Sequence, residues 1–304
     1  MKKIRIVTHS NKFHADEVCS VSTLKILLEK KEPDAEIEII RTHDPEIIKT
    51  GDFVVDVGGE YSPEKKIFDH HQKGGAGERE NKIPYSSFGL VWKEYGLELA
   101  GSQEAFELID KRMVQPIDAM DNGVSVCKNI YKDISPYLFF NAIIVFRPTW
   151  KEEDLSEDEQ FNKIVPFAVE LIKREIKTAK DEIEGRNLTE EIYQKSEDKR
   201  LIIIDQNYPW EFVMSQYPEP LFVVTPTKDA SRWKVNAVRD NPFSSFENRK
   251  DLPKGWGGKR DEDLQEVTGV SDAIFCHNNL FLVVAKSKEG AIKLAKIALE
   301  NNGK

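Results

Sequence analysis

Short β-branched runs and longer stretches of helical period alternate along the first part of the chain. Runs of five β-rich residues are typical of buried strands. Apolar positions such as Val21, Leu24 and Leu28 recur at the spacing of one helix face. The pattern predicts strands over 4–8, 37–41 and 53–57 and a helix over 17–30. Strand, helix, strand, strand at these spacings indicates a parallel sheet with covering helices.

The pattern predicts mostly helices in the middle of the chain and mostly strands after about residue 200. Residues 86 to about 190 have helical patterning, clearest over 102–120 and 161–183. Five further strands and a closing helix are predicted over 201–205, 221–225, 233–238, 273–276, 280–285 and 289–300. The charged stretch Glu184–Lys199 lies between these regions. We therefore expect an α/β protein with a parallel-sheet domain over 1–190 and a smaller α/β domain over 191–304.

Composition narrows the class of protein. The 304 residues are 32% charged and 39% hydrophobic, as in ordinary soluble globular proteins. No apolar run approaches the roughly 20 residues that a membrane helix needs. We expect no leader, because the strand predicted from Ile4 begins too close to Met1 to leave room for one. Three scattered cysteines favour a reducing, cytoplasmic setting. The net charge of −9 argues against a protein that coats nucleic acid but allows a local basic groove.

The tripeptide Asp69-His70-His71 is the most informative chemical feature. Five of the six histidines lie in the first 71 residues, and further carboxylates stand on both sides of the tripeptide. Imidazole and carboxylate together suit Mn²⁺, Zn²⁺ or Fe²⁺. Pairs of such ions commonly serve the cleavage of phosphate esters. The candidate set around the tripeptide comprises His9, His14, Asp16, Asp56, Asp118 and Asp121.

Several of these residues stand at the ends of predicted strands. His9, Asp56 and Asp69 follow β-rich runs, and in parallel sheets ligands collect beyond the carboxyl ends of the strands. His14 and Asp16 point the same way on an extended backbone, because side chains alternate with period two. Distant segments would thus deliver their side chains to one rim.

Charge arguments strengthen this interpretation. A buried lone carboxylate at Asp56 would be costly without a cation, which makes Asp56 a natural bridge between two ions. Asp118 and Asp121 are i, i+3 neighbours near a helix end, where negative charge opposes the helix dipole. Each residue alone has an ordinary structural explanation, such as a hydrogen-bonded histidine or a solvated helix aspartate. Their joint arrangement favours a shared metal site.

At these residues the chain resembles the DHH phosphoesterase superfamily and, more closely, the melanocyte-proliferating-gene exonuclease family. Fixed-order matches run almost from end to end of the chain. They include Thr8–Glu17, Val54–Tyr61, Phe68–Gln72, Ser86–Val91, Ile117–Gly123, Arg147–Trp150, Arg232–Val235, Phe243–Phe246, Trp256–Glu262 and Ile274–His277.

The resemblance implies an α/β domain with two divalent ions, Mn²⁺ preferred and Mg²⁺, Zn²⁺ or Fe²⁺ as alternatives. Asp56 would bridge them, Asp69 would orient His70, and His71 would face the scissile phosphate. We assign Asp69, His71 and Asp118 to catalysis. Most of the superfamily has Asp where His14 stands, and its G-G-G-H signature is absent, with Phe275–Asn278 as the nearest analogue. The implied ligands are His9, His14, Asp16, Asp56, His70 and Asp121.

A basic, aromatic stretch indicates how substrate binds. Residues 228–260 carry nine Lys or Arg and four Asp or Glu, with four Trp or Phe interleaved. Positive charge with aromatic platforms is typical of single-strand binding. The alternative is a solvated surface whose aromatics belong to the core, which we favour for Trp233. The predicted phosphate contacts are Arg239, Ser244, Ser245, Arg249 and His277.

These features predict a metal-dependent phosphodiesterase. The resemblance implies a 3′-to-5′ exonuclease on single-stranded nucleic acid, RNA favoured, with water activated by two metal ions. One alternative is a small-molecule phosphatase acting on pyrophosphate, a cyclic dinucleotide or a short oligonucleotide. Another is a non-catalytic, metal-dependent binding protein. The residues leave the polarity of degradation and the choice between RNA and DNA open.

Overall fold

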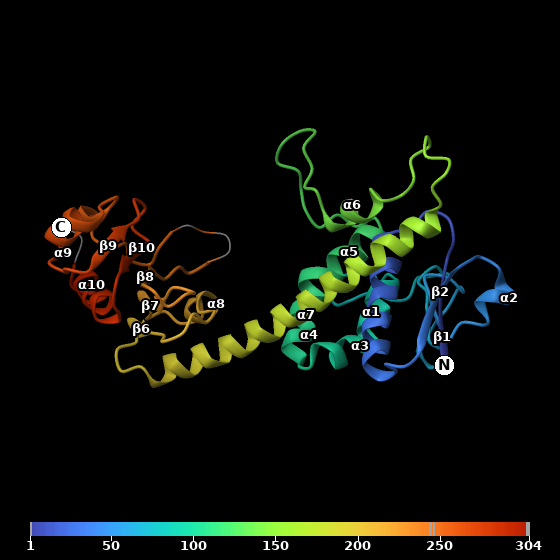
Figure 1. Ribbon diagram of the computed structural model, residues 1–304, viewed down its shortest axis with the longest axis horizontal. Coiled ribbons are helices and arrows are strands. Elements are labelled where there is room, and N and C mark those ends of the chain that lie inside the picture. Colours follow the sequence, from blue (N-terminus) through green and yellow to red (C-terminus); the bar gives the residue numbers. More distant parts are fainter. Residues whose placement is uncertain (1, 243–244, 246, 302–304) are drawn as a thin grey trace. The chain divides into compact units, whose positions relative to one another are not determined.

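The chain divides into two compact units, residues 1–180 (unit 1) and 181–304 (unit 2), each with its own five-stranded sheet (Figure 1). This computed structural model describes residues 2–242, 245 and 247–301. Ser244, one of the predicted phosphate contacts, lies outside the described residues. Both units mix helices and strands, which confirms the α/β class. No helix in the described part of the chain combines the length and apolar composition that crossing a bilayer requires.

Unit 1 is built on a mainly parallel sheet with strand order β2-β1-β3-β5-β4. The strands β1, β2, β3 and β5 run parallel, whereas β4 pairs antiparallel with β5 at the edge. The predicted parallel sheet is therefore present with one antiparallel edge strand. Its elements are β1 (Lys3–Thr8), α1 (Ala15–Lys31), β2 (Glu36–Arg41), α2 (Pro45–Ile48), β3 (Phe53–Val55), β4 (Tyr61–Ser62), β5 (Ile67–Phe68), α3 (Ser87–Ala100), α4 (Gln103–Ile109), α5 (Gln115–Asp121), α6 (Phe139–Ile144) and the start of α7 (Glu157–Lys195).

Helix α1 lies in the interior of unit 1, between the sheet and α3 (Figure 1). Thirteen of its 17 residues are buried. The hydroxyls of Ser20, Ser22 and Thr23 donate to the carbonyls four residues earlier, so these polar side chains can be buried without losing hydrogen bonds. This polar part of α1 can therefore lie inside the unit.

The helical stretch predicted over 102–120 is interrupted. Helix α4 passes into a π-helical segment at Asp110–Val114 and then into α5. A π-helical turn is rare, and such turns frequently occur at functional sites. It widens the helix locally and so redirects the side chains of α5 that follow it. The other predicted helix, 161–183, is part of α7, which continues as helix through most of the charged stretch Glu184–Lys199.

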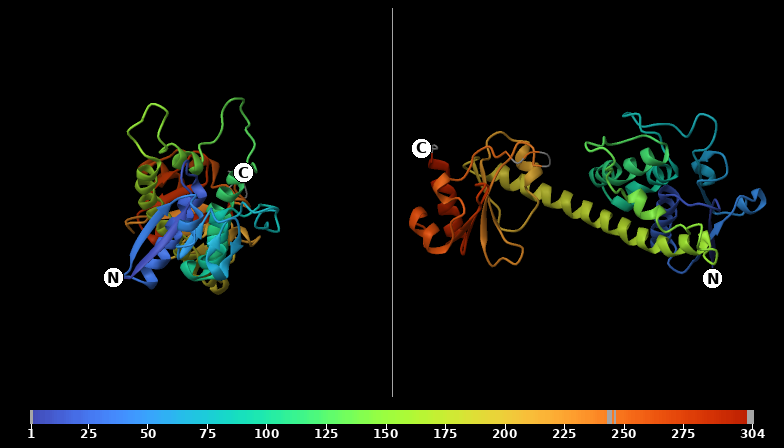
Figure 2. Two further views of the ribbon diagram at one scale, coloured as in Figure 1. Left: turned by 90° about the vertical axis from the view of Figure 1, so that its right-hand side faces the viewer. Right: turned by 90° about the horizontal axis from the view of Figure 1, so that it is seen from above.

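Unit 2 has a mixed sheet with order β6-β7-β8-β10-β9, parallel only between β6 and β7. Helix α10 packs on β7, β8 and β10, and the red helices in Figure 2 lie along that face. The opposite face packs Ile202, Val223 and Val238 against Tyr193 of α7 and Met214 of α8. All five predicted strands are present within two residues of their expected bounds. The elements are β6 (Leu201–Ile203), α8 (Glu211–Ser215), β7 (Phe222–Pro226), β8 (Trp233–Ala237), α9 (Asp261–Thr268), β9 (Ala273–Cys276), β10 (Leu282–Ala285) and α10 (Lys288–Glu300).

Candidate metal centre

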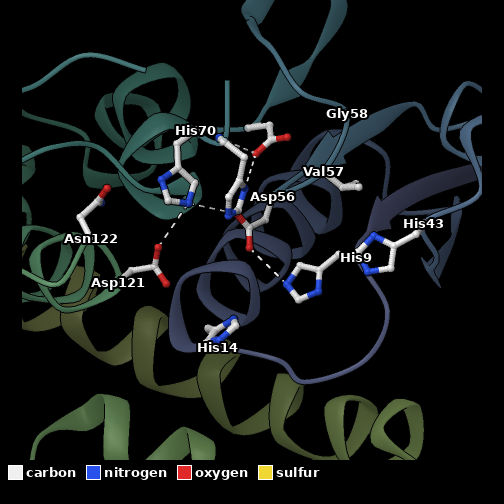
Figure 3. Close-up of a pocket in the computed structure, with 11 residues that line it drawn as sticks. His9, His14, His43, Asp56, Val57, Gly58, His70, Asp121 and Asn122 are labelled. Carbon is white, nitrogen blue, oxygen red and sulfur yellow. Dashed lines mark hydrogen bonds and ion pairs between the residues drawn. The ribbon is translucent and has the colours of Figure 1, made fainter. Parts of the chain in front are cut away.

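A cavity of about 720 Å³ opens beyond the carboxyl ends of the parallel strands of unit 1. Strands β1, β3 and β5 end at Thr8, Val55 and Phe68, so the next residue along each chain segment enters the cavity wall. The prediction that strand ends deliver their side chains to one rim is confirmed. The lining residues are His9, His14, His43, Asp56, Val57, Gly58, Asp69, His70, His71, Asp121 and Asn122 (Figure 3).

Asp56 lies at the centre of the cluster, with its side chain 3% exposed. Its Oδ2 is 3.3 Å from His9 Nε2, and its Oδ1 is 3.3 Å from His70 Nε2 and 3.6 Å from His71 Nδ1. The backbone of Asp56 is left-handed, with φ of 56°, a conformation that Asp tolerates better than most residues. The turn aims one carboxylate at three imidazoles, as a bridging ligand requires.

A second side of the cavity is formed by the loop that leads into α1. His9 and His14 have ring centroids 5.9 Å apart, and His9 Nε2 is 3.1 Å from Glu17 Oε1. His43 stacks on His9 with a centroid distance of 5.9 Å (Figure 3). Neither Glu17 nor His43 was among the predicted site residues. His43 follows the end of β2, so the rule that selected His9 and Asp56 could have found it.

Asp16 and Asp121 complete the cluster. Asp16 is fully buried, and its Oδ2 accepts a hydrogen bond of 2.8 Å from Ser87 Oγ. Asp121, the last residue of α5, has its Oδ2 3.2 Å from His70 Nε2. The structure therefore brings together all six predicted ligands.

The donor atoms fit divalent cations. Three groups can each present ligand atoms within 4.8 Å of one another: His9, His14, Glu17 and Asp56; Asp56, His70 and His71; and His14, Asp16 and Asp121. Among the described residues, Asp16 Oδ1 and Glu17 Oε2 are buried without a hydrogen bond. Buried polar atoms without partners are costly, and a bound cation would remove that cost. The clusters could thus bind metal ions.

Electrostatics in the cluster are dominated by the carboxylates. Burial alone would lower the pKa of His9 and His70, but hydrogen bonds from His9 to Asp56 and Glu17, and from His70 to Asp121 and Asp56, raise both to about 10. Burial, together with the charges of Asp56 and Asp121, raises the pKa of Asp16 well above its usual value. The histidines thus hold protons that offset negative charge, and a metal ion would compete with those protons.

The contacts of Asp69 differ from the prediction. We expected Asp69 to orient His70, but its Oδ1 is 2.8 Å from His71 Nδ1 and accepts from the His71 backbone N–H at 3.1 Å. Its Oδ2 accepts from the Gly59 N–H at 2.6 Å, where Gly59 has φ of 76°. The expectation about His70 is wrong in this structure, and Asp69 orients His71. The Asp69 hydrogen bond, despite burial, raises the pKa of His71.

Asp118, predicted to be catalytic, does not line the cavity. It is fully buried and accepts hydrogen bonds from Ser86 Oγ at 2.6 Å and Gly89 N at 2.9 Å. Its Oδ2 is 2.7 Å from Arg79 Nη1. A Cβ on Gly89 would lie 1.9 Å from Asp118 Oδ2, so this close approach requires glycine. Asp118 joins α5 to α3 and to the loop of Arg79, which is a structural role.

The predicted substrate contacts in unit 2 differ in what their side chains do. Arg249 is 7% exposed, pairs with Asp240 at 2.6 Å, and donates to the carbonyls of Met214, Tyr217, Pro220 and Ser215. Its donors are directed into the unit, so it acts as a structural clamp. Ser245 Oγ accepts from the Glu247 N–H within its own loop. Trp256, one of the interleaved aromatics, belongs to the core.

Arg239 and His277 come together at Phe281. The Arg239 guanidinium lies 5.3 Å from the centroid of the Phe281 ring, and the His277 ring lies 4.4 Å from it. Arg239 and Phe281 also line a cavity of about 250 Å³ with Trp210 and Asn236. Two predicted contacts that are far apart in sequence thus share one aromatic platform.

The fold and the cluster define an α/β protein with a candidate metal centre at the end of its parallel sheet. The chain belongs to the MYG1 exonuclease family, described as an uncharacterised protein family (UPF0160), whose family model matches residues 5–299. This confirms the resemblance to the melanocyte-proliferating-gene exonuclease family.

Full-length relatives agree with this membership. The chain is 30% identical to the MYG1 protein of Schizosaccharomyces pombe over 98% of both chains. It is 31% identical to the MYG1 protein of Dictyostelium discoideum over 100% of this chain and 99% of the relative. It is 29% identical to the MYG1 exonuclease of Homo sapiens over 97% of this chain and 85% of the relative.

Proposed function

We propose that this protein is a metal-dependent phosphodiester hydrolase that degrades single-stranded RNA from its 3′ end. The observation that carries the proposal is the buried Asp56 carboxylate, shared by His9, His70 and His71. Relatives named MYG1 exonuclease support a nuclease activity. Three unpaired cysteines support the expected reducing, cytoplasmic setting.

Two divalent ions, preferably Mn²⁺, would share Asp56. His9 and His14 would hold the first ion, and Asp16, His70 and Asp121 the second. Divalent cations in such a site lower the pKa of water and offset the charge on a phosphate. The arrangement of the protein side chains then determines where the phosphate lies.

His71 is the side chain placed to contact substrate. It is 62% exposed, although its Nδ1 is fixed by Asp69. Asp69 therefore sets the ring orientation and leaves Nε2 to donate a hydrogen bond to a phosphate oxygen. As negative charge develops on that oxygen, a donor already in position stabilises it without reorganisation.

Unit 2 would bind the strand. The Arg239 guanidinium and the His277 ring at Phe281 combine positive charge with a flat surface, which suits phosphates and bases of a single strand. We therefore retain a catalytic role for residues 1–190 and a substrate-binding role for 191–304. Arg249 is excluded from that role because its guanidinium clamps the unit internally.

Labelled oligonucleotides test the proposal. The purified protein is incubated with Mn²⁺ and single-stranded RNA or DNA of one sequence, labelled at either end, and the products are resolved by length. A 5′-labelled RNA should shorten one nucleotide at a time, and EDTA should abolish the reaction. Internal fragments, or turnover only of pyrophosphate or a cyclic dinucleotide, would overturn the exonuclease assignment. Absence of any Mn²⁺-dependent turnover would favour a binding protein.

A further inference from the structure

Glu17 is a fully buried carboxylate for which the proposed function has no role. It lies in the first turn of α1, and its Oε1 accepts a hydrogen bond of 2.6 Å from the His14 backbone N–H. The same oxygen is 3.1 Å from His9 Nε2. Its Oε2 is buried and has no hydrogen-bond partner among the described residues. Half of this carboxylate is therefore unexplained by the protein around it.

Helix capping explains only part of this placement. His14 is the N-cap of α1 and Glu17 occupies the third helical position, so the hydrogen bond to the His14 N–H belongs to a capping box. A glutamine would satisfy that N–H equally well and would not bury a charge. Within the described residues, Glu17 forms no ion pair with a Lys or an Arg; its ion-pair partner is His9. Arg147, whose charge acts on Glu17, uses its Nε to donate to the Phe13 carbonyl.

Charge balance points to a cation. The three groups that could hold an ion contain four carboxylates, Asp16, Glu17, Asp56 and Asp121. Their other members are histidines, which bind metal ions as neutral imidazoles. Two divalent ions carry the four positive charges that neutralise this set, whereas three carboxylates would leave an excess positive charge. Glu17 presents a ligand atom within 4.8 Å of those of His9, His14 and Asp56.

We propose that Glu17 is a fourth protein ligand of the ion held by His9, His14 and Asp56. The inference rests on the proposed metal centre and adds a ligand to it. It makes the first turn of α1 part of the site, because His14, Asp16 and Glu17 then all contact bound ions. Metal binding should consequently stabilise α1 and the helices packed on it.

The inference is tested by comparing the wild type with the Glu17→Gln variant. Both proteins are treated with a chelator and then titrated with Mn²⁺ in a calorimeter. Glutamine keeps the cap to the His14 N–H and most of the volume but removes the charge. The wild type should bind two ions. In Glu17→Gln the Mn²⁺ affinity of one site should fall, and that of the other should not change. The fall should exceed the roughly 10–100-fold that is typical when a residue that only orients a metal ligand is lost. Ser102→Ala, which removes the cap of α4, is the matched control and should leave Mn²⁺ binding intact.

Thermal unfolding provides a readout independent of the titration. Without metal, Glu17→Gln should melt close to the wild type, because glutamine keeps the cap to the His14 N–H and loses both a buried charge and the ion pair of that charge with His9. With Mn²⁺ it should gain less than the wild type does. An equal gain in melting temperature with Mn²⁺ in both proteins, or unchanged binding of two ions, would show that Glu17 is only a cap. If the wild type itself binds no Mn²⁺, the proposed metal centre fails instead.

Discussion

Replacing Asp69 by Asn tests whether the carboxylate that holds His71 in place controls turnover. Asp69 is almost fully buried, and its two oxygens serve Gly59 N–H, His71 N–H and His71 Nδ1. Asparagine offers one oxygen and one NH₂ group. Whichever way the amide turns, its NH₂ meets a backbone N–H, so one of the two backbone hydrogen bonds must be lost.

The size of the effect follows from these contacts. A hydrogen bond to a charged group contributes about 1.5–3 kcal/mol, so we expect Asp69→Asn to lower the free energy of unfolding by that amount. Loss of the group that fixes a functional imidazole typically costs about 10–100-fold in activity. The kcat should therefore fall within that range. Mn²⁺ affinity should stay near the wild-type value, because within the described part of the chain the Asp69 carboxylate is bonded to Gly59 and His71 and not to His70.

A double-mutant cycle is the decisive assay. Single-turnover rates are measured at saturating Mn²⁺ for Asp69→Asn, His71→Ala and the double variant. If Asp69 acts through His71, the double variant should be no slower than His71→Ala alone. Asp198→Asn, which breaks a local contact to Arg200 in unit 2, serves as the control and should keep wild-type rates. Additive losses, or a loss of Mn²⁺ affinity equal to that of His70→Ala, would refute the reasoning.

Three further predictions concern charge placement. Asp56→Asn should abolish Mn²⁺-dependent turnover and reduce Mn²⁺ stoichiometry in titrations, and normal rates with two bound ions would contradict bridging. Arg249→Ala should lower the free energy of unfolding by about 3 kcal/mol or more and leave the RNA affinity of the folded protein unchanged. Arg239→Ala should weaken RNA binding and lower the free energy of unfolding by only about 1 kcal/mol, since its main contact is the Phe281 ring; the reverse pattern would disprove both roles. Burial raises the pKa of Asp118 from 3.8 to about 6, so the protonated form stabilises the fold fully at pH values well below 3.8, and this stabilisation is lost as the pH rises through 6. Relative to Asp118→Asn, the wild type should lose about 2 kcal/mol between pH 4 and 7 in denaturant titrations, and a flat difference would count against the shift.

Strand ends made part of the site predictable from the sequence. Short β-branched runs locate where strands stop, and the residue after each stop lies at the rim of a parallel sheet. That reasoning found His9, Asp56 and Asp69. It also applies to His43, which was missed because it stands two residues beyond its strand rather than directly after it.

Side-chain partners could not be predicted in the same way. Asp69 contacts His71 instead of His70 because the local backbone, held by Gly59, decides which neighbour it faces. Asp118 and Asp121 share a helix, yet Asp118 turns to Gly89 and Asp121 to the cavity. A long side chain such as Arg249 can equally reach solvent or fold inward, and only tertiary contacts decide. Glu17 was overlooked because its spacing from His14 is that of an ordinary capping residue.

Helix direction explains why the cluster gathers so much negative charge in one place. Asp16 and Glu17 stand in the first turn of α1, where the helix dipole favours carboxylates. Asp121 is the last residue of α5, where the dipole opposes a negative charge. The helix dipole thus favours Asp16 and Glu17 and disfavours Asp121, whose charge is offset within the structure by His70. Of these three helix carboxylates, Asp121 is therefore the one whose position should depend most strongly on bound metal in the proposed centre.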